Sequence, residues 1–130
     1  MNPRRLPLAS LARLCRSLAT LLESGVTLLK ALKVAAGKSG DARVTRALDE
    51  VAGRIRGGAD LHVAFAETGA FPRLFVELTE VAESTGHLPE TLRALAEHYE
   101  NLLRLRKAFL AQISWPITQL AIAVLVIGFV

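Results

Sequence analysis

The chain has 130 residues, enough for one domain with a core of ordinary size, and it is rich in Leu, Ala and Val but poor in aromatic residues. Its net charge of +4 admits an anionic partner, but its 16 Lys and Arg are interleaved with 12 Asp and Glu, so we expect no nucleic-acid partner. Cys15 is the only cysteine, which excludes an intrachain disulfide and a multi-thiolate zinc site. Its apolar surroundings predict a buried side chain.

Hydrophobic periodicity predicts helices in chain order. Apolar residues recur every three or four positions over residues 8–24, 28–36 and 41–56, and a shorter helix is predicted at 61–67. The next helix, 72–84, is expected to bury one face, made of Leu74, Phe75, Leu78, Val81 and Ala82. A sixth helix begins near Pro89, and no glycine interrupts it before Gly128. The fold class predicted is all-α, a six-helix antiparallel bundle.

Two of the predicted helix corners share the pattern G-x-[TD]-L-x-x-A-[LF], starting at Gly25 and Gly58. Glycine suits a left-handed residue just past a helix end. Thr27 and Asp60 carry short oxygen side chains that could cap the following helices. The recurrence leaves internal duplication open, because any helical hairpin uses the same residues.

The stretch 71–99 contains a third corner, which the rest of the chain is predicted to be organised around. Phe71 and Pro72 precede one helix, and Glu83, Gly86 and Leu88 follow it in the pattern E-x-[ST]-G-x-L. Pro72 and Pro89 are expected at the first position of their helices, where a missing N–H costs nothing.

Three carboxylates, Glu77, Glu80 and Glu83, are spaced three apart on the helix before this corner. Carboxylates this close repel each other unless a cation or a basic partner lies between them. The pattern fits a solvated acidic face. It also fits a contact surface for a basic partner, or a weak calcium site using Glu80 and Glu83.

The end of the chain is apolar. No charged side chain occurs from residue 108 to 130, and Arg104, Arg106 and Lys107 come directly before it. Because basic residues beside a span mark its cytoplasmic side, we predict a cytoplasmic helical bundle over 1–107 and the start of a truncated transmembrane helix over 108–130. Trp115 is expected to anchor this helix at the interface and Pro116 to bend or restart it. A long buried core helix is the alternative.

The beginning of the chain is not expected to direct export, because Arg13 and Arg16 interrupt its apolar run. The amino-terminal part is therefore expected to stay in the cytoplasm.

The order of these motifs resembles the platform proteins of type II secretion and type IV pilus machines, the general secretion pathway F family. The resemblance rests on L-A-x-L-L-x-S-G-V-x-L-L-x-A-L at 18–32, the corner at 58–65, Phe71-Pro72, and Val81-Ala82-Glu83 with Gly86 and Leu88. Trp115-Pro116 lies where that family usually has Tyr-Pro.

The resemblance implies the first cytoplasmic domain of an inner-membrane scaffold that couples an assembly ATPase to pilin-like subunits. It further implies contact with the lipid bilayer and other assembly proteins, and homo-oligomers of two or more copies. Family members usually carry a second copy of the domain and further spans, so we expect this chain to be a fragment. Whether the machine is a secretion, pilus or tight-adherence system stays open.

The sequence predicts no enzyme and no cofactor. It lacks a phosphate-binding loop of the form G-x-x-x-x-G-K-[ST]. His62, His87 and His98 are interpreted as neutral surface residues. The alternatives to a scaffold are a membrane-anchored nucleic-acid-binding regulator and a soluble helical adaptor whose tail is buried in an oligomer.

Overall fold

The structure, a computed structural model, describes residues 5–129, and for residues 110–115 it describes the backbone only. The described residues form six helices, which confirms the all-α prediction. They are α1 (Leu8–Glu23), α2 (Leu28–Lys38), α3 (Ala42–Arg56), α4 (Leu61–Thr68), α5 (Arg73–Thr85) and α6 (Leu88–Phe129).

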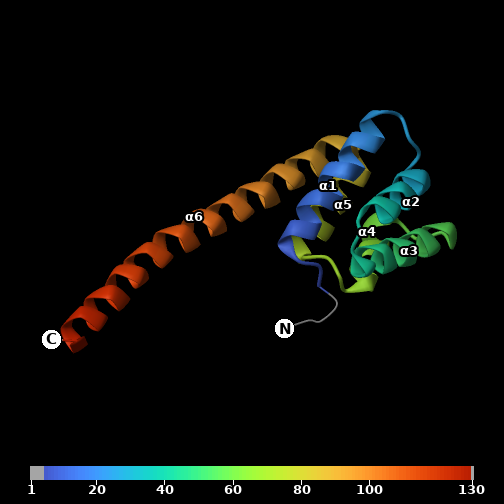
Figure 1. Cartoon of the computed structure of the whole chain (residues 1–130). Helices are drawn as coiled ribbons and strands as arrows, with labels where there is room; N and C mark the ends of the chain where they lie inside the picture. The colour runs from blue at the N-terminus through green and yellow to red at the C-terminus, as the bar shows by residue number, and fades with distance from the viewer. Residues whose placement is uncertain (1–4, 130) are drawn as a thin grey trace.

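Helix α1 packs along the first part of α6, as Figure 1 shows, and so brings the first and last helices of the bundle together. Two ion pairs join these helices, Glu23 with Arg93 and Arg16 with Glu100. Glu23 follows Arg16 along α1, whereas its partner Arg93 precedes Glu100 along α6. The two helices therefore run antiparallel. In the rest of the bundle, each helix packs against the helix that follows it in the chain.

The core is built from aliphatic and aromatic side chains of every helix. Its largest fully buried apolar members are Phe65, Phe75, Leu18, Leu32, Leu48, Leu92, Leu95, Val51 and Cys15. Burial of side chains of this size is the main stabilising contribution in a domain this small. The prediction that Cys15 is buried is confirmed, because the residue has no exposed surface.

The two repeated corners adopt the same backbone geometry. Gly25 has a φ of 87° and Gly58 a φ of 100°, which a residue with a Cβ would adopt only with strain. In each corner the N–H one residue after the glycine donates to a carbonyl five residues back, from Val26 to Leu21 at 3.1 Å and from Ala59 to Arg54 at 3.0 Å. These bonds belong to the Schellman motif and use carbonyls that the helix end leaves unpaired.

The predicted side-chain caps at these corners are wrong. Thr27 and Asp60 lie at the N-cap positions of α2 and α4 with extended backbones, but neither side chain caps its helix. Asp41, at the start of α3, does cap, because its Oδ1 accepts the N–H of Arg43 at 2.9 Å. The side chains of Thr27 and Asp60 therefore do not contribute a cap to the two repeated corners.

Helix α5 buries a narrower face than predicted. Phe75 and Ala82 are buried as expected, but Leu74 and Val81 are 43% and 58% exposed, and Leu78 is also exposed. Thr79 is buried instead, and its hydroxyl donates to the carbonyl of Phe75 at 2.7 Å. That bond satisfies the hydroxyl inside the core, which allows a polar residue to lie on the inward face.

The two prolines predicted at first helical positions lie one residue away from them. Pro72 is the N-cap of α5, and Pro89 is the second residue of α6. Both positions lack an intrahelical partner for the N–H, so the physical reason for the prediction still holds.

Helix α6 continues far beyond the bundle, and in Figure 1 its carboxyl-terminal half projects away from the other five helices. It passes through Pro116 without ending, so the expected restart does not occur. Within the described part of the chain, no helix combines the length and the apolar character needed to cross a membrane.

Candidate functional site

The corner between α5 and α6 is set by Gly86. Its φ of 74° turns the chain left-handed, and the N–H of His87 donates to the carbonyl of Ala82 at 3.0 Å. Leu88 then begins α6, and it packs half-buried against the core. The left-handed glycine predicted for this corner is confirmed at Gly86.

Glu83 holds the amino-terminal end of α4. Its Oε2 accepts the N–H of Leu61 at 3.0 Å, and its Oε1 accepts the N–H of His62 at 2.8 Å. The first N–H groups of a helix have no partner within it, and the helix dipole favours a negative charge at that end. Glu83 on α5 therefore replaces the cap that Asp60 does not supply, and we call this arrangement the Glu83 clamp.

The ring of His62 completes the Glu83 clamp, with its Nδ1 2.7 Å from Oε1 of Glu83. The hydrogen bond and the charge of Glu83 raise the pKa of His62. Burial would raise the pKa of Glu83, but hydrogen bonds from the backbone and ring of His62 and from Leu61 outweigh it, and that pKa is lowered. His62 is thus a partly buried partner of a carboxylate, which corrects its interpretation as a neutral surface residue.

The other two carboxylates of α5 do not join the Glu83 clamp. Glu77 accepts a hydrogen bond from Arg73 one turn away, and Glu80 is exposed. Among the described residues, no three His, Cys, Asp or Glu side chains gather as metal ligands. Because both oxygens of Glu83 already accept hydrogen bonds, a calcium site with Glu80 would need further ligands, and it stays a prediction.

Phe71 lies in an aromatic cluster beneath the start of α5. Its ring stacks on Phe75 with centroids 4.9 Å apart, and Phe65 of α4 meets both rings edge-on at 4.6 and 4.8 Å. Such arrangements add to the stabilisation from burial alone. Phe71 and Pro72 therefore fix the entry of α5 beside α4, and the same two helices are joined at their other contact by the Glu83 clamp.

A half-open cavity of about 480 Å³ lies between α1, the end of α2 and α6, and sequence reasoning missed it. Arg13 and Ser17 of α1, Lys38 of α2 and Glu100 of α6 line it. Small side chains, which leave the space open, line much of the rest: Ala9, Ser10, Ala12, Ala35 and Ser39. The only sequence signal was the run of small residues on one face of the first helix.

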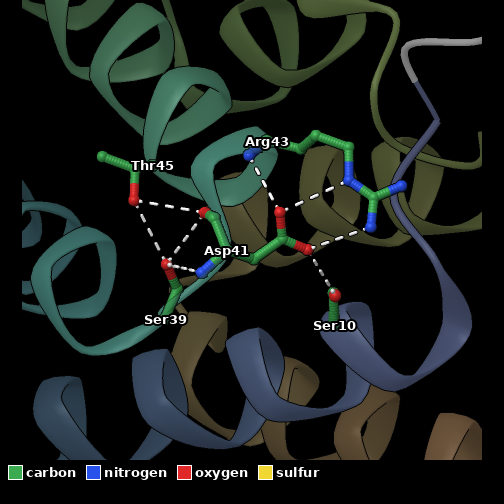
Figure 2. A network of polar contacts seen from close by, with 5 residues as sticks. All are labelled: Ser10, Ser39, Asp41, Arg43 and Thr45. Carbon is green, nitrogen blue, oxygen red and sulfur yellow. Dashed lines mark hydrogen bonds and ion pairs between the residues drawn. The ribbon is translucent and has the colours of Figure 1, made fainter.

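A polar network fixes the wall of this cavity at the corner between α2 and α3, as Figure 2 shows. Asp41 accepts the hydroxyl of Ser10 at 3.2 Å and the guanidinium of Arg43 at 3.2 and 3.3 Å. The Ser39 hydroxyl lies 3.2 Å from that of Thr45 and 3.1 Å from the carbonyl of Ala36. Hydrogen bonds to Arg43 hold the pKa of Asp41 below its usual value, so the link between α1 and α3 is charged at neutral pH.

The far end of α6 is exposed and apolar. Large apolar side chains from Ile117 to Phe129 are between 56% and 94% exposed, and Pro116 is exposed too. The side chain of Trp115 lies outside the described residues, so its predicted anchoring role is not addressed by the structure. The structure therefore contradicts the alternative that this segment is a buried core helix within one copy of the chain.

Residues 14–130 match the family model described as type II secretion system (T2SS), protein F. The chain belongs to this family. The resemblance drawn from the corner motifs is thereby confirmed, and proteins of the family are platform proteins rather than enzymes.

Relatives from both pilus and secretion machines are similar to the chain. It is 36% identical over 122 residues, 94% of its length, to the type 4 fimbrial assembly protein PilC of Pseudomonas putida. It is 32% identical over 117 residues, 90% of its length, to the type IV pilus assembly protein PilC of Thermus thermophilus. It is 29% identical over 120 residues, 92% of its length, to the type II secretion system protein F of Vibrio cholerae.

The chain spans only 30%, 29% and 30% of the lengths of these three relatives. It therefore corresponds to one domain of a platform protein.

Proposed function

We propose that this chain is the first cytoplasmic domain and the beginning of the first transmembrane helix of an inner-membrane platform protein. In that role it would act as a scaffold that couples a cytoplasmic assembly ATPase to the assembly of pilin-like subunits. The match of residues 14–130 to the protein F family is the observation that carries this proposal.

The course of α6 supports a mechanical role. This single helix packs against α1 inside the bundle and continues without a break to its exposed apolar end. A continuous helix transmits a displacement along its axis, because every turn is hydrogen-bonded to the next. A partner that moves the bundle would therefore move the far end of α6 as well.

The charge pattern of α6 supports placing its end in the bilayer. Arg104, Arg106 and Lys107 precede the uncharged stretch, as expected for the cytoplasmic side of a membrane protein. The apolar side chains beyond them have no cover within the bundle. A lipid surface would remove them from water, at about 25 cal/mol for each Å² buried.

Nucleic-acid binding is less well supported. Arg16, Arg43, Arg54, Arg73 and Arg93 each pair with a carboxylate of the chain itself. The carboxylates offset the positive charges of these arginines, which weakens their attraction for the phosphates of a nucleic acid.

The direct test is removal of residues 1–130 from the encoded protein in its own bacterium, with assembled surface pili and secreted substrate proteins measured separately. We expect the loss of one of the two, and which one is lost identifies the machine. Normal levels of both would contradict the scaffold proposal.

A second test concerns the membrane. Leu125→Arg in the exposed end of α6 should reduce recovery of chain 1–130 in the membrane fraction, because an arginine in the bilayer costs about 2.5–3.5 kcal/mol. Leu125→Val is the matched control and should fractionate like the unchanged chain. Equal recovery of both variants would contradict the bilayer placement.

A further inference from the structure

The cavity between α1, α2 and α6 is lined by charged side chains to which the proposed scaffold function assigns no role. Three basic side chains and one acidic side chain line it: Arg13, Arg16, Lys38 and Glu100. Arg16 is paired with Glu100, so these two charges cancel. Arg13 and Lys38 have no acidic partner in the described part of the chain, and they leave the cavity with a net charge of +2.

The hydrogen-bond donors of the cavity divide into two groups. Ser10 and Ser39 are engaged in the polar network of Figure 2, so they shape the wall and are not available to a ligand. Arg13, Ser17 and Lys38 have no hydrogen-bond partner among residues 5–109, and all three line the same cavity. Two cationic donors and one hydroxyl are therefore available on two different helices.

We propose that this cavity binds the phosphate group of an organic phosphate ester. A phosphomonoester carries up to two negative charges and three acceptor oxygens, which match the two unpaired cations and the three donors, whereas a carboxylate carries only one charge. The guanidinium of Arg13 would supply a forked pair of donors and the ammonium of Lys38 a point charge.

The apolar part of the lining indicates that the ligand is larger than inorganic phosphate. Leu14, Val44 and Leu103 line the same space, and its volume lies within the range of small-molecule sites. The organic part of the ester would lie against these side chains. The ester could be a soluble metabolite or the headgroup of phosphatidic acid, and both would present the same phosphomonoester.

The wall of the cavity is positioned before any ligand arrives. Ser39 and Asp41 hold the end of α2, which carries Lys38, against the start of α3, while Ser10 fastens α1 to the same corner. A site that is already ordered loses less conformational entropy on binding.

The experiment uses chain 1–130 in dodecyl maltoside, a detergent without phosphate. Inorganic phosphate, glycerol 3-phosphate and phosphatidic acid are titrated separately, and dissociation constants are taken from the NMR shifts of the Ser17 and Ser39 amides. The test variant is Arg13→Glu with Lys38→Glu. The matched control, Lys33→Glu with Arg46→Glu, changes the net charge equally at exposed positions outside the cavity.

We expect at least one of the two esters to bind the unchanged chain and the control equally, and more tightly than inorganic phosphate. The test variant should bind it at least ~100-fold more weakly, because each lost charge-assisted hydrogen bond accounts for about tenfold. Tighter binding of glycerol 3-phosphate would identify a soluble ligand, and tighter binding of phosphatidic acid a lipid headgroup.

Three results would overturn the proposal: no ester binds, the control loses as much affinity as the test variant, or the test variant keeps its affinity. Should the test variant fail to melt cooperatively by circular dichroism, Arg13→Gln with Lys38→Gln replaces it under the same criteria. None of these outcomes bears on the scaffold function, because pilus assembly and secretion are measured independently.

Discussion

The Glu83 clamp gives a sharp test of how the bundle is held together. Glu83→Ala removes both carboxylate oxygens, which leaves the N–H groups of Leu61 and His62 at the start of α4 without a protein partner. Loss of a helix cap costs about 1 kcal/mol, and loss of a hydrogen bond to a charged group costs a similar amount or more. We expect the free energy of unfolding to fall by about 2 kcal/mol.

For a domain of this size that loss corresponds to a melting temperature about 8 °C lower. The assay is thermal unfolding followed by circular dichroism, with urea unfolding as a second measurement. The matched control is Glu77→Ala on the same helix, since Glu77 pairs only with exposed Arg73. An exposed pair of this kind contributes about 0.2–1 kcal/mol, so the control should change stability far less. Equal effects of the two variants would refute the capping role of Glu83.

The same contact predicts a pH dependence. Because the pKa of His62 is raised in the folded chain, its charged form stabilises the fold below about pH 6.5, and this contribution is lost as the pH rises through the raised value. The pKa of Glu83 is lowered, so its contribution is present above the unfolded value and lost as the pH falls through the folded one. The unchanged chain should therefore have a higher free energy of unfolding than His62→Gln at pH 6, and this stability advantage should shrink by pH 9. An advantage that grows with pH would contradict the assigned charges.

Three further predictions concern the backbone, the core and the outer face of α5. Gly86→Ala should lower the free energy of unfolding by about 1–2 kcal/mol, because alanine is strained in a left-handed backbone even though nothing lies within 4 Å of the added Cβ. Gly53→Ala, in the middle of helix α3, should instead raise it by roughly 0.5–1 kcal/mol. Similar urea midpoints for the two glycine variants would contradict the left-handed backbone as the cause of the loss. Burial raises the pKa of Cys15 to about 12, so a thiol reagent at pH 8 should modify it only at the rate of unfolding, and rapid modification of the native chain would show that it is accessible. Phe75→Ala should cost about 3–5 kcal/mol and Val81→Ala less than about 1, and comparable losses in thermal unfolding would mean that the burial of α5 is wrongly assigned.

Local residue patterns were sufficient to predict the order of the helices, the burial of Cys15 and the left-handed glycines at Gly25, Gly58 and Gly86. These features depend on side-chain periodicity and on backbone sterics, which act over a few residues. The family resemblance had the same basis, because the corner motifs record local geometry in a fixed order.

Only the tertiary structure decided which side of α5 faces inward. Apolar residues lie on both sides of this helix, so periodicity alone admitted Leu74 and Val81 to the core, and the packing of α4 and α6 selected Phe75, Thr79 and Ala82 instead. The role of Glu83 also required the fold, since its partners Leu61 and His62 lie 22 and 21 residues earlier in the chain. The cavity lined by Arg13 and Lys38 was equally beyond local patterns, because it is formed where three helices meet around small side chains. Short-range steric preferences depend only on adjacent residues, whereas a contact between helices far apart in sequence forms only when the chain has packed.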